Sequence, residues 1–341
     1  MLINNKIKNK IQSVGVYLPQ EIVSSDSLFE EIRSEEQYGL PLTWMEEKMG
    51  IYERRVAPST FSPSDLAIPA ALHALDECTQ KITQDIDLVI FCGIERDQPE
   101  PATAHIIQHS LGLNARYAFD IANACYGFVD GMQIADSYLK AGLVKAALVV
   151  TGEIPSRVLR AAVDVLKRGV DIKTARNIIG ALSVGDAGGA VVICQNFDDS
   201  NSGFELFNVN SFSQLAKKCM YKNGKNGQIE GHMNMGEISG AFIKEHQNLI
   251  GDTLMKLGWD EFDWMLTHQI GRKPFERLSA LRGVSPLKMV KTLDKLGNIT
   301  SATFPVNFQQ LKTSGVAKRG DKVGGCFAGS GLVIGQFGYT Y

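Results

Sequence analysis

The chain of 341 residues has no excess of charge of either sign, because 35 lysines and arginines stand against 37 acidic side chains and the formal net charge is −2. This balance gives no indication of a nucleic-acid or membrane-surface partner. No apolar run approaches the ~18 residues of a membrane helix, and the first ten residues lack the apolar stretch of a signal peptide. We therefore expect an ordinary globular protein without membrane insertion.

The six cysteines do not form close pairs. They lie at positions 78, 92, 125, 194, 219 and 326, without C-x-x-C spacing and without a short cysteine–histidine cluster. This spacing argues against a structural zinc site and against a disulfide framework. We expect no bound metal, and we expect a reducing cytoplasm as the location.

One cysteine lies where a predicted strand gives way to a predicted helix. Cys125 precedes a helix expected from about Tyr126 to Ala141, with Gly142 as a left-handed C-cap. Free N–H groups and the positive end of the helix dipole would favour the thiolate and lower the pKa of the cysteine. A buried, inert cysteine is the alternative interpretation.

Two distant segments supply partners for this thiol. An apolar strand that starts at Asp263 ends in His268, and Gly297-Asn298 precedes a polar run typical of a helix start. A cysteine with a distant histidine and asparagine is the pattern of a cysteine nucleophile. His268 would accept the thiol proton, and His268 and Asn298 would then donate hydrogen bonds to an enolate oxygen. Each residue alone is weak evidence, and the three together favour a catalytic site.

Spacings of about half the chain predict an internal duplication. The strands that begin at Asp87 and Asp263 stand 176 positions apart, and Cys125 and Asn298 stand 173 apart. Such a repeat predicts two similar α/β halves related by a pseudo-twofold axis, which would bring Cys125 beside Asn298.

The expected halves are residues 1–196, which carry the nucleophile, and residues 197–341, which carry the histidine and asparagine. The polar stretch 196–202 has turn character and marks the boundary. Within the first half, an insertion at about 153–180 is expected to form a helical cap and part of a tunnel wall.

Two glycine-rich segments, 185–190 and 329–331, occupy different places next to the predicted strands. The segment 185–190 precedes a strand, which is the wrong order for a dinucleotide-binding loop. Gly329-Ser330-Gly331 lies between two apolar runs near the C-terminus. It is either a simple turn or a turn whose N–H near Ser330 forms an oxyanion hole with the N–H of Cys125. The residues alone leave both interpretations open.

Together these motifs resemble the thiolase superfamily, specifically the 3-oxoacyl-ACP synthase III-like condensing enzymes. The matching segments, in the family's order over nearly the whole chain, are N-A-C-Y-G-F, G-D-A-G-G-A, T-H-Q-I-G-R, L-G-N-I-T-S-A and A-G-S-G. The resemblance implies a thiolase-like five-layer αβαβα sandwich of two duplicated halves, usually a homodimer. It places the nucleophile on Cys125, the histidine on His268 and the asparagine on Asn298.

The resemblance also implies a binding site for coenzyme A or the phosphopantetheine of an acyl carrier protein. Trp44 matches a tryptophan that stacks on adenine, and Lys48 falls where those enzymes have an arginine. Arg272 resembles a basic residue near the tunnel mouth, and Arg157 is a further candidate partner for phosphopantetheine.

A second subfamily resembles the chain more closely in two places. The segment R-D-Q-P-E-P-A-T at 96–103 and the ending A-G-S-G-L look like the head-to-head acyl-CoA condensing enzymes of bacterial olefin synthesis. There the glutamate matched by Glu100 reaches into the partner subunit's active site and removes the α-proton of the second acyl group. A solvated charge between two prolines is the alternative interpretation of Glu100.

The expected reaction is a Claisen condensation of two acyl thioesters to a 3-oxoacyl product through an acyl-cysteine, in fatty-acid, olefin or polyketide-like biosynthesis. The resemblance implies no metal or redox cofactor. Two alternatives are acyl transfer to an oxygen or nitrogen nucleophile without condensation, and a supporting subunit of a condensing heterodimer.

Overall fold

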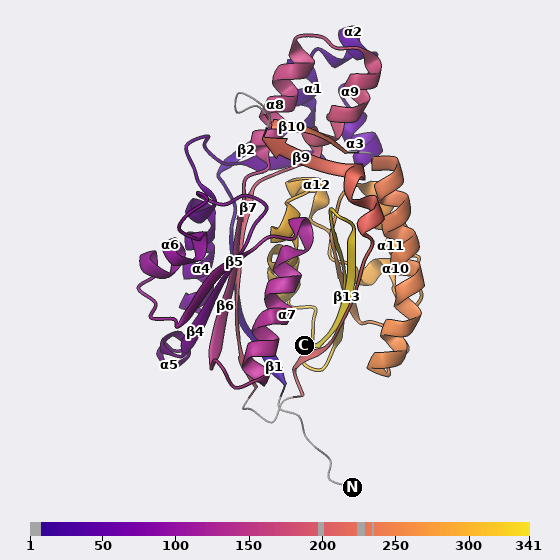
Figure 1. Ribbon diagram of the computed structural model, residues 1–341. Coiled ribbons are helices and arrows are strands. Elements are labelled where there is room, and N and C mark those ends of the chain that lie inside the picture. Colours follow the sequence, from indigo (N-terminus) through magenta and orange to yellow (C-terminus); the bar gives the residue numbers. More distant parts are fainter. Residues whose placement is uncertain (1–7, 197–200, 224–228, 234) are drawn as a thin grey trace.

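Two β-sheets form the frame of the molecule, and each comes from one half of the chain (Figure 1). The computed structural model describes residues 8–196, 201–223, 229–233 and 235–341. The first sheet has the order β1-β7-β6-β4-β5, and the second has the order β8-β13-β12-β11. The strands of the first sheet are β1 (Asn9–Tyr17), β4 (Ile86–Cys92), β5 (Tyr117–Ile121), β6 (Ala146–Glu153) and β7 (Ala187–Gln195). Those of the second are β8 (Gly203–Ser211), β11 (Trp264–Thr267), β12 (Lys322–Gly329) and β13 (Val333–Thr340).

Helices lie between the two sheets and on both outer faces, which gives five layers (Figure 1). The inner layer consists of α7 (Gly127–Lys140) and α13 (Thr303–Ser314). The first sheet is covered outside by α4 (Pro63–Asp76), α5 (Gln80–Gln84) and α6 (Thr103–Ser110). The second is covered by α10 (Met235–Leu257) and α11 (Arg272–Leu278). The predicted five-layer arrangement of two duplicated halves is therefore confirmed.

The duplication has one constant spacing over three consecutive elements. The 3₁₀ turns η1 (Ala124–Tyr126) and η5 (Thr300–Ala302) begin 176 residues apart. The same spacing separates the starts of α7 and α13 and the starts of β6 and β12. At this spacing the counterpart of Cys125 is Ser301 and not Asn298. Cys125 and Asn298, which stand 173 residues apart, line the same pocket but are not equivalent positions of the repeat.

The inner helices pack through aromatic side chains. Phe128 of α7 and Phe304 of α13 stack with their ring centroids 5.8 Å apart. Phe304 also meets Phe327 of β12 and Phe337 of β13 edge to face. The helix predicted from 126 to 141 is found as α7, and Gly142 has a φ of 69° just beyond its end. These contacts fix the start of α7, and with it Cys125, against the second half.

A separate group of short helices covers one end of the two sheets (Figure 1). Apolar side chains of these helices form their own cluster. The members are α1 (Ser25–Glu31), α2 (Ser34–Tyr38), α3 (Trp44–Met49), α8 (Ser156–Lys167), α9 (Ile172–Ile178) and the 3₁₀ turn η2 (Ile179–Ser183). The segment predicted to be a cap, 153–180, contains α8 and α9. The predicted boundary between the halves falls partly on residues 197–200, which lie outside the described residues.

The remaining elements are short and lie near the cap or on loops. They are β2 (Glu21–Ser24), β3 (Glu53–Val56), the 3₁₀ turns η3 (Ser213–Lys218) and η4 (Pro286–Lys288), β9 (Cys219–Asn223), β10 (Ile229–Met233) and α12 (Leu293–Leu296). Among the described residues, no helix combines the length and apolarity needed to cross a bilayer.

The close packing of β6 on α4 gives a stability prediction. A Cβ on Gly152 would come within 1.9 Å of the Pro63 carbonyl oxygen, so Gly152→Ala must push strand and helix apart. We expect a loss of about 1–3 kcal/mol in the free energy of unfolding. The control is Gly251→Ala on α10, where a Cβ would meet nothing within 4 Å and should stabilise by about 0.5–1 kcal/mol. Urea unfolding of both variants measures this, and equal midpoints would contradict the packing argument.

Candidate active site

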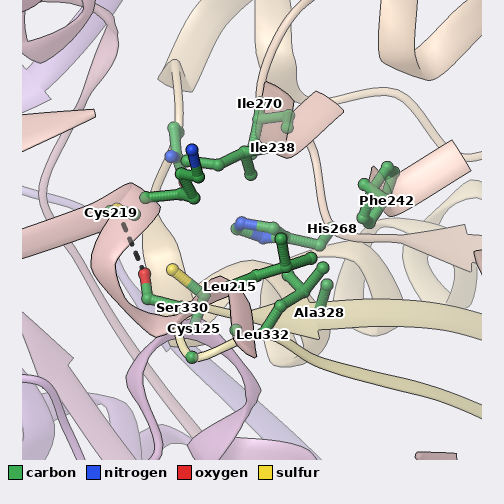
Figure 2. A pocket seen from close by; sticks show the side chains of 14 residues that line it. Cys125, Leu215, Cys219, Ile238, Phe242, His268, Ile270, Ala328, Ser330 and Leu332 are labelled. Carbon is green, nitrogen blue, oxygen red and sulfur yellow. Dashed lines mark hydrogen bonds between the residues drawn. The ribbon is translucent and has the colours of Figure 1, made fainter. Parts of the chain in front are cut away.

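A pocket between the two halves brings together three of the four residues predicted to be catalytic. Cys125, His268 and Asn298 all line it, together with the turn at 329–331. Figure 2 shows Cys125, His268 and Ser330 around this pocket. The rest of its lining is largely apolar and includes Leu215, Ile238, Phe242, Ile270 and Leu332. A pocket of this kind suits an apolar substrate that reacts at one polar end.

Cys125 is presented by a strained turn. It is the middle residue of η1, which leads directly into α7, and its side chain is half-buried. Ala124 has a φ of 48°, a conformation that costs a residue with a Cβ about 1 kcal/mol or more. The surrounding packing holds this turn in place, and the turn sets the direction of the thiol.

The charge state predicted for Cys125 is wrong. Burial raises the pKa of the Cys125 thiol, and the nearby Glu153 and Cys219 raise it further. The expected stabilisation by the start of α7 is outweighed because desolvation penalises a thiolate more than a helix dipole favours it. The side chain of Cys125 is therefore a neutral thiol at rest, and it would need a base to act as a nucleophile.

His268 is the candidate for that base, because its ring is neutral at rest and lines the same pocket. It follows β11, its side chain is 5% exposed, and burial lowers its pKa to about 4. The Thr303 hydroxyl donates to the Thr300 carbonyl at 2.7 Å, so its oxygen can accept from Nδ1 of His268, 3.5 Å away. This contact favours the tautomer with a proton on Nδ1 and a lone pair on Nε2. A neutral imidazole of this kind can accept the thiol proton.

Asn298 is held through both its side chain and its backbone. Its Oδ1 accepts from the Thr300 backbone N–H at 3.0 Å, which leaves the Nδ2 hydrogens to face the pocket that Asn298 lines. Its backbone bonds with Ser183 at 2.8 Å and with Gly185 at 3.2 Å. The segment 185–190 therefore positions the catalytic loop, and its last four residues lie within β7.

Arg54 supports this arrangement, and sequence analysis did not single it out. Its buried guanidinium donates to the Leu182 carbonyl at 2.9 Å, to Ser25 Oγ at 3.1 Å and to the Val23 carbonyl at 3.1 Å. Burial lowers its pKa to about 10, so it stays charged at neutral pH. Two adjacent arginines in I-Y-E-R-R look like a solvated surface pair, so the sequence carried no signal for this role.

The turn at Ser330 lies against the turn that carries the nucleophile. A Cβ on Gly329 would come within 2.7 Å of the Asn123 carbonyl oxygen and 3.0 Å of the Tyr126 N, so only glycine allows this approach. Ser330 lines the same pocket as Cys125. This placement agrees with an oxyanion hole built from backbone N–H groups, which stays a prediction for Ser330 and Cys125.

Two further pocket residues were missed from the sequence. Cys219 opens β9, and its sulfur accepts a hydrogen bond from Ser330 Oγ at 3.3 Å (Figure 2). Phe242 of α10 is buried in the wall. Neither residue lies in a recognisable motif, and each reaches the pocket from an element distant in sequence from Cys125.

The residues predicted to bind coenzyme A divide into two groups. Trp44 and Lys48 lie on α3. Arg272, at the start of α11, donates a hydrogen bond to the backbone carbonyl of Glu46, which also belongs to α3. Arg157 lies elsewhere, because its guanidinium pairs with Glu95 at 2.7 Å and donates to the Phe61 carbonyl at 2.8 Å.

Glu100 does not line the pocket of its own chain. It is exposed on the loop between β4 and α6. A role in the partner subunit's site, as the resemblance implies, stays a prediction. Among the described residues, no cluster of three or more His, Cys, Asp or Glu is placed to hold a metal ion.

Comparison with known proteins decides the family. The sequence model of the 3-oxoacyl-[acyl-carrier-protein] synthase III family matches residues 119–213. The family model of the C-terminal part of these enzymes matches residues 255–340. A beta-ketoacyl-[acyl-carrier-protein] synthase III of Bradyrhizobium diazoefficiens is 30% identical over 96% of this chain and 99% of the relative. The chain belongs to the 3-oxoacyl-ACP synthase III family. The Rickettsia felis enzyme of the same name is 29% identical over 96% of this chain and 98% of its own.

Solved structures of Xanthomonas campestris OleA share the fold. One variant superposes with a TM-score of 0.91 at 25% identity, covering 98% of this chain and 99% of the other. A cysteine-to-serine variant with bound lauric acid and lauroyl-CoA gives 0.90 at 26% identity, covering 98% and 100%. The predicted family, the thiolase-like fold and the reaction class, a Claisen condensation by an acyltransferase, are thereby confirmed.

The burial of His268 gives a prediction of pH dependence. Because its pKa in the folded protein is about 4, below the ordinary 6.5, the folded state binds fewer protons than the unfolded state between these values. Stability should therefore fall as the pH drops from 6.5 through 4, whereas the rate of Cys125 acylation should fall only as the pH approaches 4, where the folded protein takes up the proton. We expect the acid midpoint of first-turnover CoA release near pH 4, with circular dichroism as the folding control. A midpoint at pH 6.5 in folded protein would contradict a buried neutral histidine.

Proposed function

We propose that Cys125, His268 and Asn298 carry out a two-stage condensation in which two acyl thioesters become one 3-oxoacyl product. The observation that carries this proposal is the convergence of these three side chains on one largely apolar pocket. Each comes from a different element boundary, and a purely structural role would not require a thiol, an imidazole and an amide to face the same space.

In the first stage, Nε2 of His268 accepts the proton of Cys125, and the sulfur attacks the carbonyl carbon of an acyl thioester. Backbone N–H groups at Cys125 and near Ser330 stabilise the negative oxygen of the tetrahedral intermediate. The bond from carbon to the leaving sulfur breaks, a free thiol departs with the proton, and the acyl group remains on Cys125.

In the second stage, another thioester becomes a carbon nucleophile. The Nδ2 hydrogens of Asn298 donate to the enolate oxygen, and His268 donates to it in the other neutral tautomer, with the proton on Nε2 and Nδ1 accepting from the Thr303 hydroxyl. The α-carbon attacks the acyl-Cys125 carbonyl, and the sulfur of Cys125 leaves as the new carbon–carbon bond forms. This chemistry uses side chains and backbone N–H groups, with coenzyme A or phosphopantetheine thioesters as substrates and no resident cofactor.

We place Glu100 of the partner subunit as the base that forms the enolate when the donor has no carboxyl group to lose. A carboxylate placed beside the α-carbon of a thioester can accept its proton as a general base. This assignment requires a homodimer, since Glu100 lies outside its own chain's pocket. We place the enzyme in the cytoplasm, where its thiols stay reduced.

Trp44, Lys48 and Arg272 are the proposed contacts for the nucleotide end of coenzyme A or for a carrier protein's phosphopantetheine. An aromatic face for adenine and two cations for phosphate fit such a ligand. Arg157 is a weaker candidate, because Glu95 and Phe61 already hold its guanidinium.

Intact-protein mass and product analysis test the proposal together. After incubation with acyl-CoA, wild-type protein and the control Cys78→Ala should gain one acyl group, and Cys125→Ala should gain none. A 3-oxoacyl product from acyl-CoA alone that falls at least tenfold in Glu100→Gln supports the proton-removal mechanism. A product that requires malonyl-CoA assigns a decarboxylating donor and removes the role of Glu100. An ester, an amide, or acylation of Cys125→Ala would contradict the condensation mechanism.

A further inference from the structure

Glu153 is a buried acid that the two-stage reaction leaves unused. It ends β6, and it is 2% exposed. The Ile94 backbone N–H faces both of its carboxyl oxygens, at 3.2 and 3.4 Å, and Ser301 Oγ makes a shorter hydrogen bond with Oε1. A buried acid with a dedicated set of partners on other segments is placed to hold those segments together.

The Ile94 contact fixes the start of the loop that carries Glu100. Further along this loop, Glu95 pairs with Arg157 at 2.7 Å, and Asp97 accepts from the Ser64 backbone N–H at 2.9 Å. Both of those side chains are partly exposed, whereas Glu153 is fully enclosed. All three hydrogen bonds are part-buried, and of these three only the Glu153 contact joins the loop to a buried side chain that also bonds to Ser301 of the second half.

The Ser301 contact joins the same carboxyl to the second half of the chain. Ser301 Oγ lies 3.0 Å from the Cys92 carbonyl oxygen and 2.7 Å from Thr151 Oγ1, and all three residues are buried. Ser301 belongs to η5, which packs against the η1 turn of Cys125. Glu153 therefore connects the structure around the nucleophile with the Glu100 loop.

We propose that Glu153 is a positioning residue that ties the Glu100 loop to the floor of the Cys125 site, so that each subunit holds its base in place for the partner's second half-reaction. The inference rests on the role proposed for Glu100. It assigns to Glu153 an effect on condensation that is separate from acylation.

The protonation of Glu153 fits this position. Burial raises its pKa to about 8, and the hydrogen bonds from Ser301 and Ile94 oppose that rise. The titratable groups around it are Cys92, Cys125 and Glu95, and Glu95 is paired with Arg157. At neutral pH the acid is mostly uncharged, so it adds little negative charge beside the thiol or the developing enolate. Above pH 8 its ionisation would oppose both.

The test compares Glu153→Leu, which cannot accept the Ile94 N–H, with Glu153→Gln, which keeps a neutral acceptor of the same shape. Acylation of Cys125 by intact mass and 3-oxoacyl product per acyl-enzyme are measured for each. Glu153→Leu should acylate within about threefold of wild type and condense at least tenfold more slowly, and Glu153→Gln should restore condensation. Equal losses in both stages, or no loss in either, would overturn the proposal.

Hydrogen exchange of the peptide 93–102 separates this proposal from the role of Glu100. Exchange should be faster in Glu153→Leu and unchanged in Glu153→Gln, and this readout does not depend on catalysis. If Glu100→Gln condenses normally while exchange rises in Glu153→Leu, the Glu100 mechanism fails and the anchoring by Glu153 stands. Unchanged exchange in Glu153→Leu would refute the anchoring.

If Glu153→Leu does not fold, Ser301→Ala, which removes the hydrogen bond from Ser301 Oγ to the Glu153 carboxyl, takes its place in both measurements. The pH profile of Glu153→Gln separately tests the neutral state of Glu153. Wild-type condensation per acyl-enzyme should fall between pH 7 and 9.5, with a midpoint near 8. The Gln variant should lose this alkaline fall, since it has no proton to release. The same alkaline fall in both proteins would contradict a role for the neutral Glu153.

Discussion

The site depends on one kind of contact, in which a central strand of one half packs against the 3₁₀ turn of the other half. The end of β12 packs against η1, and the end of β6 packs against η5, so the two contacts are related by the internal repeat. At the first contact Gly329 has no side chain and lies directly against the Cys125 turn, and both line the pocket. At the second, Glu153 fills the equivalent space and bonds to Ser301, the counterpart of Cys125. One duplicated geometry therefore yields one open catalytic site and one closed structural contact.

Burial sets the charge of every group at this centre. It raises the pKa of Cys125 and Glu153 and lowers that of His268, so all three are mostly or wholly neutral at rest. A reaction that passes through an oxyanion and an enolate then forms its charge where N–H donors are already oriented. The same desolvation that keeps the thiol neutral makes these donors more effective once the charge develops.

The fold and the main site residues were accessible from the sequence because they depend on local patterns. The strand before His268, the helix after Cys125 and the glycine at 142 each carry a short signal. The dipole argument for Cys125 failed because the sequence does not report how deeply a turn is buried. Arg54, Cys219 and Phe242 could not be found, since their roles arise only when distant segments meet. The sequence already showed the spacing of 176 between the strands at Asp87 and Asp263. The element boundaries show that η1, α7 and β6 share it, which makes Ser301, and not Asn298, the counterpart of Cys125 in the repeat.

A crystal structure of the acylated protein is the most direct test of the central claim that the repeat builds a single acyl-cysteine site between the halves. The account predicts continuous density from Cys125 Sγ to an acyl carbonyl carbon, with the carbonyl oxygen directed at the backbone N–H groups of Cys125 and the turn at Ser330. The remaining acyl chain should contact the apolar wall near Phe242. An acyl group on Cys219 instead of Cys125, or a carbonyl oxygen directed away from both backbone donors, would contradict the account.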